Sequence, residues 1–149
     1  SLSVNGKLIG ELHDPETHLI PTVVYKAIFK KKIFIYGNNY KTKDGTCVRD
    51  YIHIMDLAEG HLSAIEYLLN HEKQFLTINL GTSEGVSVLN FIYQFQETNN
   101  IRIKYEFGHR REGDSAWVVA DNKLALDILD WEPKKNLIDM CRDSLNSLI

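Results

Sequence analysis

The sequence predicts one mixed α/β domain over residues 1–149. Two observations support this prediction. Apolar residues recur with helical spacing in several segments, and short β-branched and aromatic runs closed by turn residues lie between them. In addition, 44% of the 149 residues are hydrophobic and 25% are charged, which is an ordinary globular composition with enough apolar material for one core.

The first half of the chain predicts five segments. These are a helix over 19–29, a strand over 33–36, a polar loop over 42–46, an extended segment over 47–54 and a helix over 57–69. Pro21 suits the first turn of the first helix, and the lysines at 30–32 complement its carboxyl end. Asp56 is the expected N-cap of the second helix.

The second half of the chain predicts five more elements. They are a strand over 75–80, a helix over 88–95, a strand over 101–107 and helices over 121–129 and 137–148. Gly81 ends the first of these strands, and Ser87 is the expected N-cap of the helix that follows. Trp117 is large and is expected in the core.

Charge and cysteine content exclude several classes of protein. The net charge of −3 argues against a nucleic-acid binder that works by broad phosphate neutralisation. No run approaches the roughly 18 apolar residues of a membrane span, and the start of the chain lacks signal-peptide features, so a cytoplasmic protein is expected. Cys47 and Cys141 have neither disulfide nor zinc spacing, so we expect reduced thiols and no metal.

The stretch 107–114, FGHRREGD, concentrates positive charge locally. His109, Arg110 and Arg111 are consecutive, and two acids follow at Glu112 and Asp114. Adjacent arginines in a domain are usually solvated or paired with such acids. The alternative is a local anion-binding site within an acidic chain.

Motifs that would place nucleotide chemistry in this chain are absent from the sequence. We find no GxGxxG or GxxGxxG turn, no GxxxxGK[ST] loop and no YxxxK pair that would supply a tyrosine base. No catalytic residue is therefore predicted.

Four stretches together resemble a known family. They are ETHLIP (16–21), IYGNNYKTKDGTCVRDYIHIMDLAEGH (35–61), INLGTSEGVSVL (78–89) and RREGD (110–114). In this order they are similar to the C-terminal part of UDP-glucose 4-epimerases, which belong to the extended short-chain dehydrogenase superfamily. Each stretch alone is weakly specific, but the collinear combination covers nearly the whole chain. The second stretch recurs in related nucleotide-sugar enzymes.

The resemblance implies a two-domain parent, in which an N-terminal Rossmann domain holds NAD and a smaller domain binds the UDP-sugar. Such a parent moves a hydride from sugar C4 to NAD, lets the 4-keto intermediate turn and returns the hydride to the opposite face. The family's catalytic tyrosine and lysine precede the matched segment. Residues 1–149 are therefore expected to be a C-terminal UDP-sugar-binding fragment, which lacks the Rossmann half, has no cofactor of its own and is inactive alone.

The resemblance also assigns three residues that bind the diphosphate and the ribose. Arg111 matches the family position that pairs with the diphosphate, and Arg49 matches a second diphosphate contact. Asp114 matches the residue that hydrogen-bonds the ribose hydroxyls. Arginine suits both of its positions because its planar fork forms bidentate bonds to phosphate oxygens.

Further contacts follow from the same resemblance. Phe34, Ile35 and Tyr36 match a short strand whose backbone and terminal aromatic ring flank the uracil. His18 and Leu19 stand where the family often has an Asn-Leu pair beside the diphosphate, so His18 departs from that pattern. The backbone N–H groups of a helix start would suit an anion there.

Val118 aligns with a position whose bulk varies in the family, and a small side chain there implies room for an N-acetyl group at sugar C2. Four other polar residues are expected to be structural: His53 and His61 because they lie beside apolar residues, and Asp50 and Asp56 because they flank predicted elements.

The resemblance also predicts an exposed surface. The segment 49–69 returns toward the nucleotide domain in the extended dehydrogenases, so part of its apolar face would pack on residues outside this chain. We therefore expect an exposed apolar patch, self-association or strand exchange between copies, and thus a homo-oligomer or a self-associating fragment.

Two alternatives remain open. Another nucleotide-sugar epimerase, decarboxylase or dehydratase would share these stretches. A stand-alone nucleotide-sugar-binding module would keep these binding contacts and catalyse no reaction.

Overall fold

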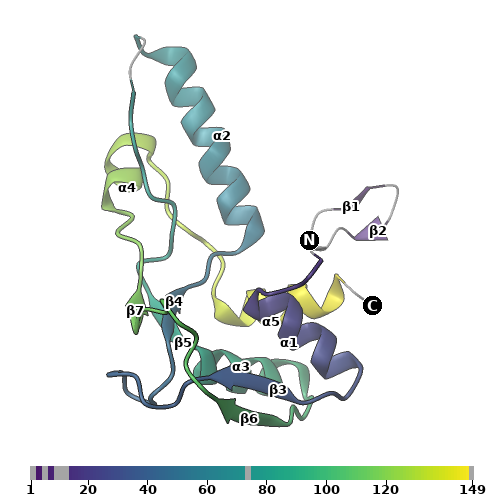
Figure 1. The fold of residues 1–149 in the computed structure, drawn as a ribbon. Helices are drawn as coiled ribbons and strands as arrows, with labels where there is room; N and C mark the ends of the chain where they lie inside the picture. Colours follow the sequence, from purple (N-terminus) through teal and green to yellow (C-terminus); the bar gives the residue numbers. More distant parts are fainter. Residues whose placement is uncertain (1–2, 5–6, 9–13, 73–74, 148–149) are drawn as a thin grey trace.

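The computed structural model describes residues 3–4, 7–8, 14–72 and 75–147, and these form a mixed α/β fold as predicted (Figure 1). The helices are α1 (Leu19–Ile28), α2 (Ile54–Asn70), α3 (Val88–Asn99), α4 (Lys123–Leu129) and α5 (Leu137–Asn146). The strands are β1 (Ser3–Val4), β2 (Lys7–Leu8), β3 (Ile33–Tyr36), β4 (Val48–Asp50), β5 (Gly85–Ser87), β6 (Tyr105–Gly108) and β7 (Trp117–Val118). The predicted end of the last helix, at residue 148, lies outside the described residues.

The strands form three small sheets. β3 pairs in parallel with β6, from Ile33 opposite Tyr105 to Tyr36 opposite Gly108. β4 lies between β5, which is antiparallel to it, and β7, which is parallel to it. β1 and β2 form a separate antiparallel pair that the sequence analysis did not predict. The parallel pairs matter most for the site. Because paired parallel strands have their carboxyl ends at the same edge of the sheet, they bring segments that are distant in the sequence together there.

One core holds the lower body of the molecule together. Its buried residues come from α1, β3, α3, α5 and the segment before β6: Val23, Val24, Ala27, Ile33, Ile35, Phe91, Ile92, Phe95, Ile103 and Cys141. Burying a side chain such as Phe91 or Phe95 stabilises the fold by about 2–3 kcal/mol. Burial also raises the pKa of the Cys141 thiol to about 12, so this thiol stays protonated.

The start of α2 differs from the prediction. The helix begins at Ile54, and its N-cap is His53, whose Nδ1 accepts from the Met55 N–H at 3.1 Å. His53 Nε2 lies 3.1 Å from Asp143 on α5, so this buried ring is structural as expected. Asp56 is also structural but is not the cap: it lies within the first turn and accepts from the Lys135 N–H at 2.9 Å. A histidine that accepts through Nδ1 caps a helix as a carboxylate would, which the sequence pattern did not reveal.

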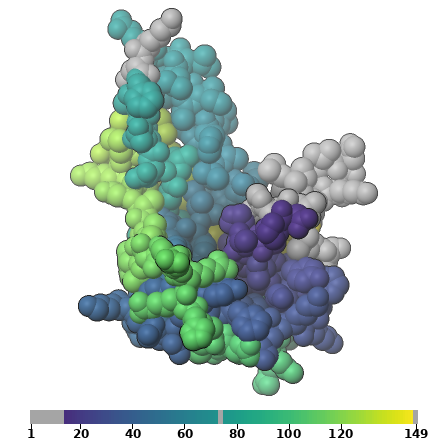
Figure 2. All heavy atoms as spheres, in the orientation of Figure 1, coloured from purple at the N-terminus to yellow at the C-terminus, as the bar shows by residue number. Residues whose placement is uncertain are grey.

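α2 projects from the body as an arm, and residues 75–80 run back along it (Figures 1 and 2). The predicted strand over 75–80 is wrong, because no described strand pairs with this segment. The Phe75 side chain is 91% exposed. An apolar run becomes a strand only where another strand offers its backbone groups, and none does so here.

The arm also exposes the face of α2 formed by Leu62, Ile65, Leu68 and Leu69, called here the α2 apolar face. Each of these side chains is more than half exposed, and Leu69 reaches 79%. The expected exposed patch is therefore present. In the described part of the chain, no helix is long and apolar enough to span a bilayer.

The base of the arm is held by Trp131. Its indole N–H donates to the Asp56 carbonyl at 3.1 Å, and Gly60 lets Trp131 and Leu80 approach α2 closely. A Cβ at Gly60 would lie 2.9 Å from a Leu80 methyl group. Trp117, which was expected in the core, is instead 61% exposed because it lies on β7, at the edge of its sheet.

The loop between β3 and β4 is fastened by Asp44. Its carboxylate accepts from the Thr46 N–H at 2.9 Å, the Thr46 hydroxyl at 2.8 Å and the Ser87 hydroxyl at 2.5 Å. Ser87 is the N-cap of α3 as predicted, since its hydroxyl accepts from the Asn90 N–H. Burial alone would raise the pKa of Asp44, but these hydrogen bonds outweigh it and hold the pKa below its ordinary value of 3.8.

We therefore predict an acid-sensitive contribution to stability from Asp44. Because the folded state lowers the pKa, the stabilisation is complete above about pH 4, the ordinary value, and is lost as the pH falls through the lower folded value. Asp44→Asn should reduce the free energy of unfolding at pH 6 by about 1 kcal/mol and flatten its decline toward pH 3. Urea denaturation at both pH values measures this.

Asp127→Asn is the matched control, because Asp127 is exposed on α4 and its carboxylate makes no hydrogen bond within the described residues. It should leave both values unchanged. Parallel pH profiles for Asp44→Asn and the unmodified chain would contradict the prediction.

Candidate anion-binding site

The candidate site lies where two parallel strand pairs end. The carboxyl ends of β3 and β6 lie side by side, so Tyr36 comes beside the start of the segment 109–116. This segment crosses from β6 to β7, and β7 pairs with β4, which carries Arg49 (Figure 1). The cationic stretch is thereby placed between the two sheets.

Arg111 is the most available cation of this stretch. It is exposed, and its guanidinium carbon lies 4.0 Å from the centroid of the Tyr36 ring. It makes no ion pair with any described residue. Such a cation–π contact contributes about 0.5–1 kcal/mol at an exposed position, so a doubly charged anion would compete with it easily.

Arg49 and Asp114 form an ion pair beside Arg111. The Arg49 guanidinium donates to the carbonyls of Val48 and Ser115, each at 2.8 Å, and to Asp114 Oδ1 at 3.3 Å. One interpretation of the sequence paired Asp114 with the adjacent arginines, Arg110 and Arg111. In the structure its described ionic partner is Arg49. Within the described residues, the Arg49 Nε–H and the second oxygen of Asp114 make no hydrogen bond.

A tight turn sets the spacing of Arg111 and Asp114. The Asp114 N–H donates to the Arg111 carbonyl at 3.3 Å, and Gly113 has a φ of +81°. Glycine adopts this conformation without the steric cost that other residues bear. The turn therefore places a cation and a carboxylate at its two ends.

Arg110 has a structural role. Its Nε donates to the Asn39 side chain at 2.6 Å and its terminal nitrogen donates to the Asn39 carbonyl. Its guanidinium carbon also lies 4.1 Å from the centroid of the buried Tyr40 ring. Burial, followed by the neighbouring Cys47 thiol, raises the pKa of Tyr40, so the ring stays neutral. The sequence analysis did not identify Asn39 and Tyr40, although they follow β3 directly.

β3 offers both a backbone edge and an aromatic surface. The N–H groups of Ile33 and Gly37 donate to β6, so the alternate backbone groups, at Phe34 and Tyr36, face the other edge. No described strand pairs with that edge. The side chains of Phe34 and Tyr36 are exposed, whereas the Ile35 side chain is 2% exposed and its backbone groups face β6, so the predicted ligand contact at Ile35 is not available at the free edge. Arg111 covers one face of Tyr36, so a planar base would take the other face or displace it.

Val118 lies beside this cluster, because it is the register partner of Arg49 and is 53% exposed. His18 and Leu19 lie at the start of α1. The His18 N–H and ring contact Glu16 at 2.7 and 3.0 Å, and Leu19 packs against the core. In Figure 2 the purple segment that leads into α1 borders the green segment on this face.

Asp50 supports the site from behind. Its carboxylate accepts from the N–H groups of Thr82, Ser83 and Ala120, at 3.0 to 3.2 Å, and from the Thr82 hydroxyl. It thus ties the end of β4 to two neighbouring segments, so its expected structural role is confirmed. The geometry as a whole suits a ligand with clustered negative charge and a flat ring.

Comparison with protein families gives one match. The model of the family described as GDP-mannose 4,6 dehydratase matches residues 10–144, which is most of the chain.

Individual relatives point to one group of enzymes. The UDP-glucose 4-epimerase of Rhizobium leguminosarum bv. trifolii is 43% identical over 137 residues, which cover 91% of this chain and 42% of the relative. Among solved structures, the UDP-glucose 4-epimerase of Stenotrophomonas maltophila with bound NAD and formylated UDP-arabinopyranose matches with a TM-score of 0.89 and 40% identity, over 93% of this chain and 42% of that one.

A third relative is the UDP-Glc/GlcNAc 4-epimerase of Campylobacter jejuni, with a TM-score of 0.77 and 34% identity over 87% of this chain and 39% of that one. The chain thus spans about two fifths of the length of the relatives it matches.

Proposed function

We propose that this chain, which belongs to the family described as GDP-mannose 4,6 dehydratase, is the UDP-binding part of a UDP-glucose 4-epimerase. The parent enzyme would interconvert UDP-glucose and UDP-galactose through a 4-keto intermediate with bound NAD. The observation that carries the proposal is the position of Arg111 above Tyr36, one turn away from the Arg49–Asp114 pair and without an ionic partner among the described residues. The similarity to epimerases supports it.

Each residue has a distinct proposed role. Arg111 binds the diphosphate as a bidentate fork, and Arg49 contributes its free Nε–H to the same group. The second oxygen of Asp114 accepts from the ribose hydroxyls. The backbone of Phe34 and Tyr36 bonds the edge of the uracil, while the Tyr36 ring covers its face.

NAD does not fit the residues of this chain. The sequence has no glycine-rich strand–turn–helix unit for a pyrophosphate, and no tyrosine with a lysine one helical turn on. We therefore place NAD and the chemical steps in the part of the relatives' length that this chain does not span. On this proposal the chain alone is inactive, cytoplasmic and independent of nucleic acids and membranes.

The other predicted site residues would add further contacts to the UDP-sugar. The start of α1, at His18 and Leu19, would lie beside the diphosphate, with the Leu19 backbone N–H as the donor, because the His18 N–H donates to Glu16. Val118 would line the sugar C2 side. A different nucleotide-sugar enzyme, or a binding module that catalyses no reaction, would use the same UDP-binding contacts. The sequence upstream of residue 1 would distinguish these alternatives from an epimerase.

We predict that the chain binds UDP with a dissociation constant of roughly 0.1 mM or weaker, because it supplies only part of the contacts. Arg111→Ala should abolish saturable binding in a calorimetric titration. Arg111→Lys should bind more weakly than the unmodified chain, because an ammonium cannot form the bidentate fork.

Arg142→Ala is the matched control, since Arg142 is an exposed arginine of α5 whose ionic partner is Asp139. It should bind UDP unchanged. Equal binding by Arg111→Ala and Arg142→Ala would overturn the assignment of Arg111.

A second prediction concerns the sugar. In the intact enzyme, Val118→Tyr should lower kcat/KM for UDP-N-acetylglucosamine by about tenfold or more and leave UDP-glucose nearly unchanged, because only the N-acetyl group needs the space. Steady-state kinetics with both substrates measures this. Equal losses on the two substrates would contradict the role of Val118.

A third prediction concerns the α2 apolar face, which we propose is covered either by the rest of the parent or by a second copy. The chain should self-associate at high concentration in light scattering, because contiguous apolar surface is rarely left in water. Ile65→Glu with Leu69→Glu should give a monomer, and Glu66→Gln is the control. A monomeric unmodified chain would count against the prediction.

A further inference from the structure

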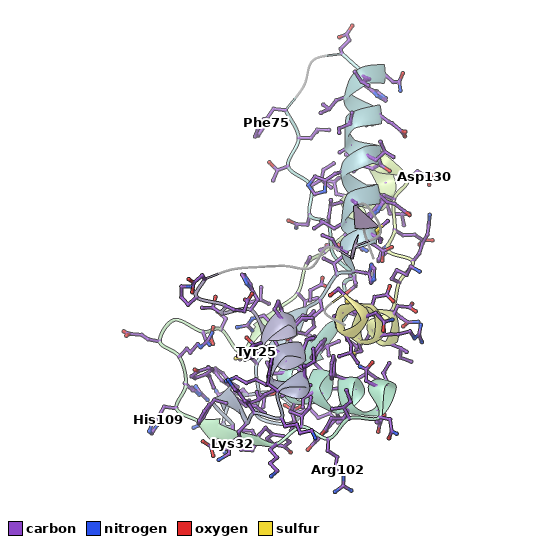
Figure 3. All side chains as sticks on the ribbon, turned by 90° about the vertical axis from the view of Figure 1, so that its right-hand side faces the viewer. Tyr25, Lys32, Phe75, Arg102, His109 and Asp130 are labelled. Atoms are coloured by element: carbon purple, nitrogen blue, oxygen red, sulfur yellow. The ribbon has the colours of Figure 1, made fainter. Side chains whose placement is uncertain are left out.

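A second concentration of positive charge lies at the opposite end of the β3–β6 pair. A hollow of about 590 Å³ opens where α1 ends and where the chain enters the two strands. It is lined by Ala27, Ile28, Lys30, Lys31, Asn100, Ile101, Arg102 and Lys104. Figure 3 shows Arg102 at the lower edge of the molecule, with Lys32 between it and His109.

The lining is strongly cationic. Four of its eight residues carry a positive charge and none is acidic, although the whole chain has a net charge of −3. Within the described residues, Lys30, Arg102 and Lys104 have no ionic partner. Lys31 turns toward Tyr25, donating to its hydroxyl at 3.2 Å. The nearby acid Glu106 is already paired with Lys32 at 2.5 Å.

Parallel pairing enforces this clustering. The residues that precede β3 and those that precede β6 must lie together, and the Ile33 N–H donates to the Lys104 carbonyl at 2.8 Å. Like charges held in this way repel one another, which costs stability unless an anion lies between them. The sequence places basic residues on both entering segments.

Lys30 adds an independent observation. It has a φ of +52° at the end of α1, where its N–H donates to the Ala27 carbonyl and the Lys31 N–H donates to the Lys26 carbonyl. This is the helix-ending motif in which glycine is usual at the left-handed position. The equivalent position after α3 is Asn100, a residue that tolerates this conformation. A lysine therefore stands at a position where glycine would be less strained.

We propose that this hollow is a second anion-binding site, for a small phosphate-bearing ligand held by Lys30, Arg102 and Lys104. Ala27, Ile28 and Ile101 supply an apolar floor, so the ligand carries an apolar or aromatic part beside its phosphate. The hollow is of the size that accommodates such a molecule. The site is separate from Arg111 and Arg49, which lie at the carboxyl ends of the strands.

The test is a titration of the 149-residue chain with inorganic pyrophosphate, followed by amide NMR shifts. It is performed on Arg111→Ala, which removes the main cation of the other site. The amides of Lys30, Lys31 and 101–104 should shift saturably, and sodium chloride of matched ionic strength should not shift them. Arg102→Gln with Lys104→Gln should weaken binding by about tenfold or more.

Lys30→Gly separates binding from folding. Glycine suits the left-handed position, so the melting temperature should stay equal or rise, while pyrophosphate binding weakens. Lys123→Gln on α4 is the control and should bind unchanged. Shifts that sodium chloride reproduces, or that survive in both hollow variants (Lys30→Gly and the Arg102→Gln/Lys104→Gln double variant), would overturn the proposal.

Discussion

The parallel pairing of β3 with β6 is the constraint on which the rest of the molecule depends. It joins segments about seventy residues apart and fixes what lies at each end of the pair. At the carboxyl ends it places Tyr36 beside Arg111, and at the amino ends it places Lys30 beside Lys104. The two proposed anion-binding regions of this acidic chain are thus both consequences of one short register. The core residues Ile33 and Ile35 keep that register by anchoring β3 on the side facing the helices.

The arginines of the site are held in place, but their positive charges are not all neutralised. Arg49 is positioned largely by two backbone carbonyls, and Arg110 by both oxygens of Asn39. Carbonyls fix a guanidinium in place without cancelling its charge as a carboxylate would. Asp114 pairs with Arg49 through one carboxylate oxygen and lies one turn from Arg111, and its second oxygen makes no hydrogen bond within the described residues. The result is a preformed positive region whose geometry is set before an anion arrives.

Elements and caps that depend on neighbouring residues could be predicted from the sequence. Contacts that depend on pairing between distant segments could not. β3 begins and ends at the predicted residues because its apolar run is closed by a left-handed Gly37, and Ser87 caps α3 as expected. Arg111 and Asp114 were identified by resemblance and do lie together. The partner of Asp114, by contrast, depends on how two sheets meet, which no local pattern reports. Asp56 was misassigned for a similar reason, since its bond to Lys135 joins distant segments.

The error over residues 75–80 shows how the arm differs from the body. An apolar run predicts a strand correctly only if a partner strand is available, and within the described chain this run has none. The same arm leaves Leu69 and Phe75 largely in water, while Trp131 secures only its base. The body encloses a buried core, although Phe34 and Trp117 stay exposed on it, whereas the arm leaves the α2 apolar face in water. The residues of the proposed anion-binding site therefore all lie in the body, whereas the α2 apolar face is the part of the described chain that is left without a packing partner.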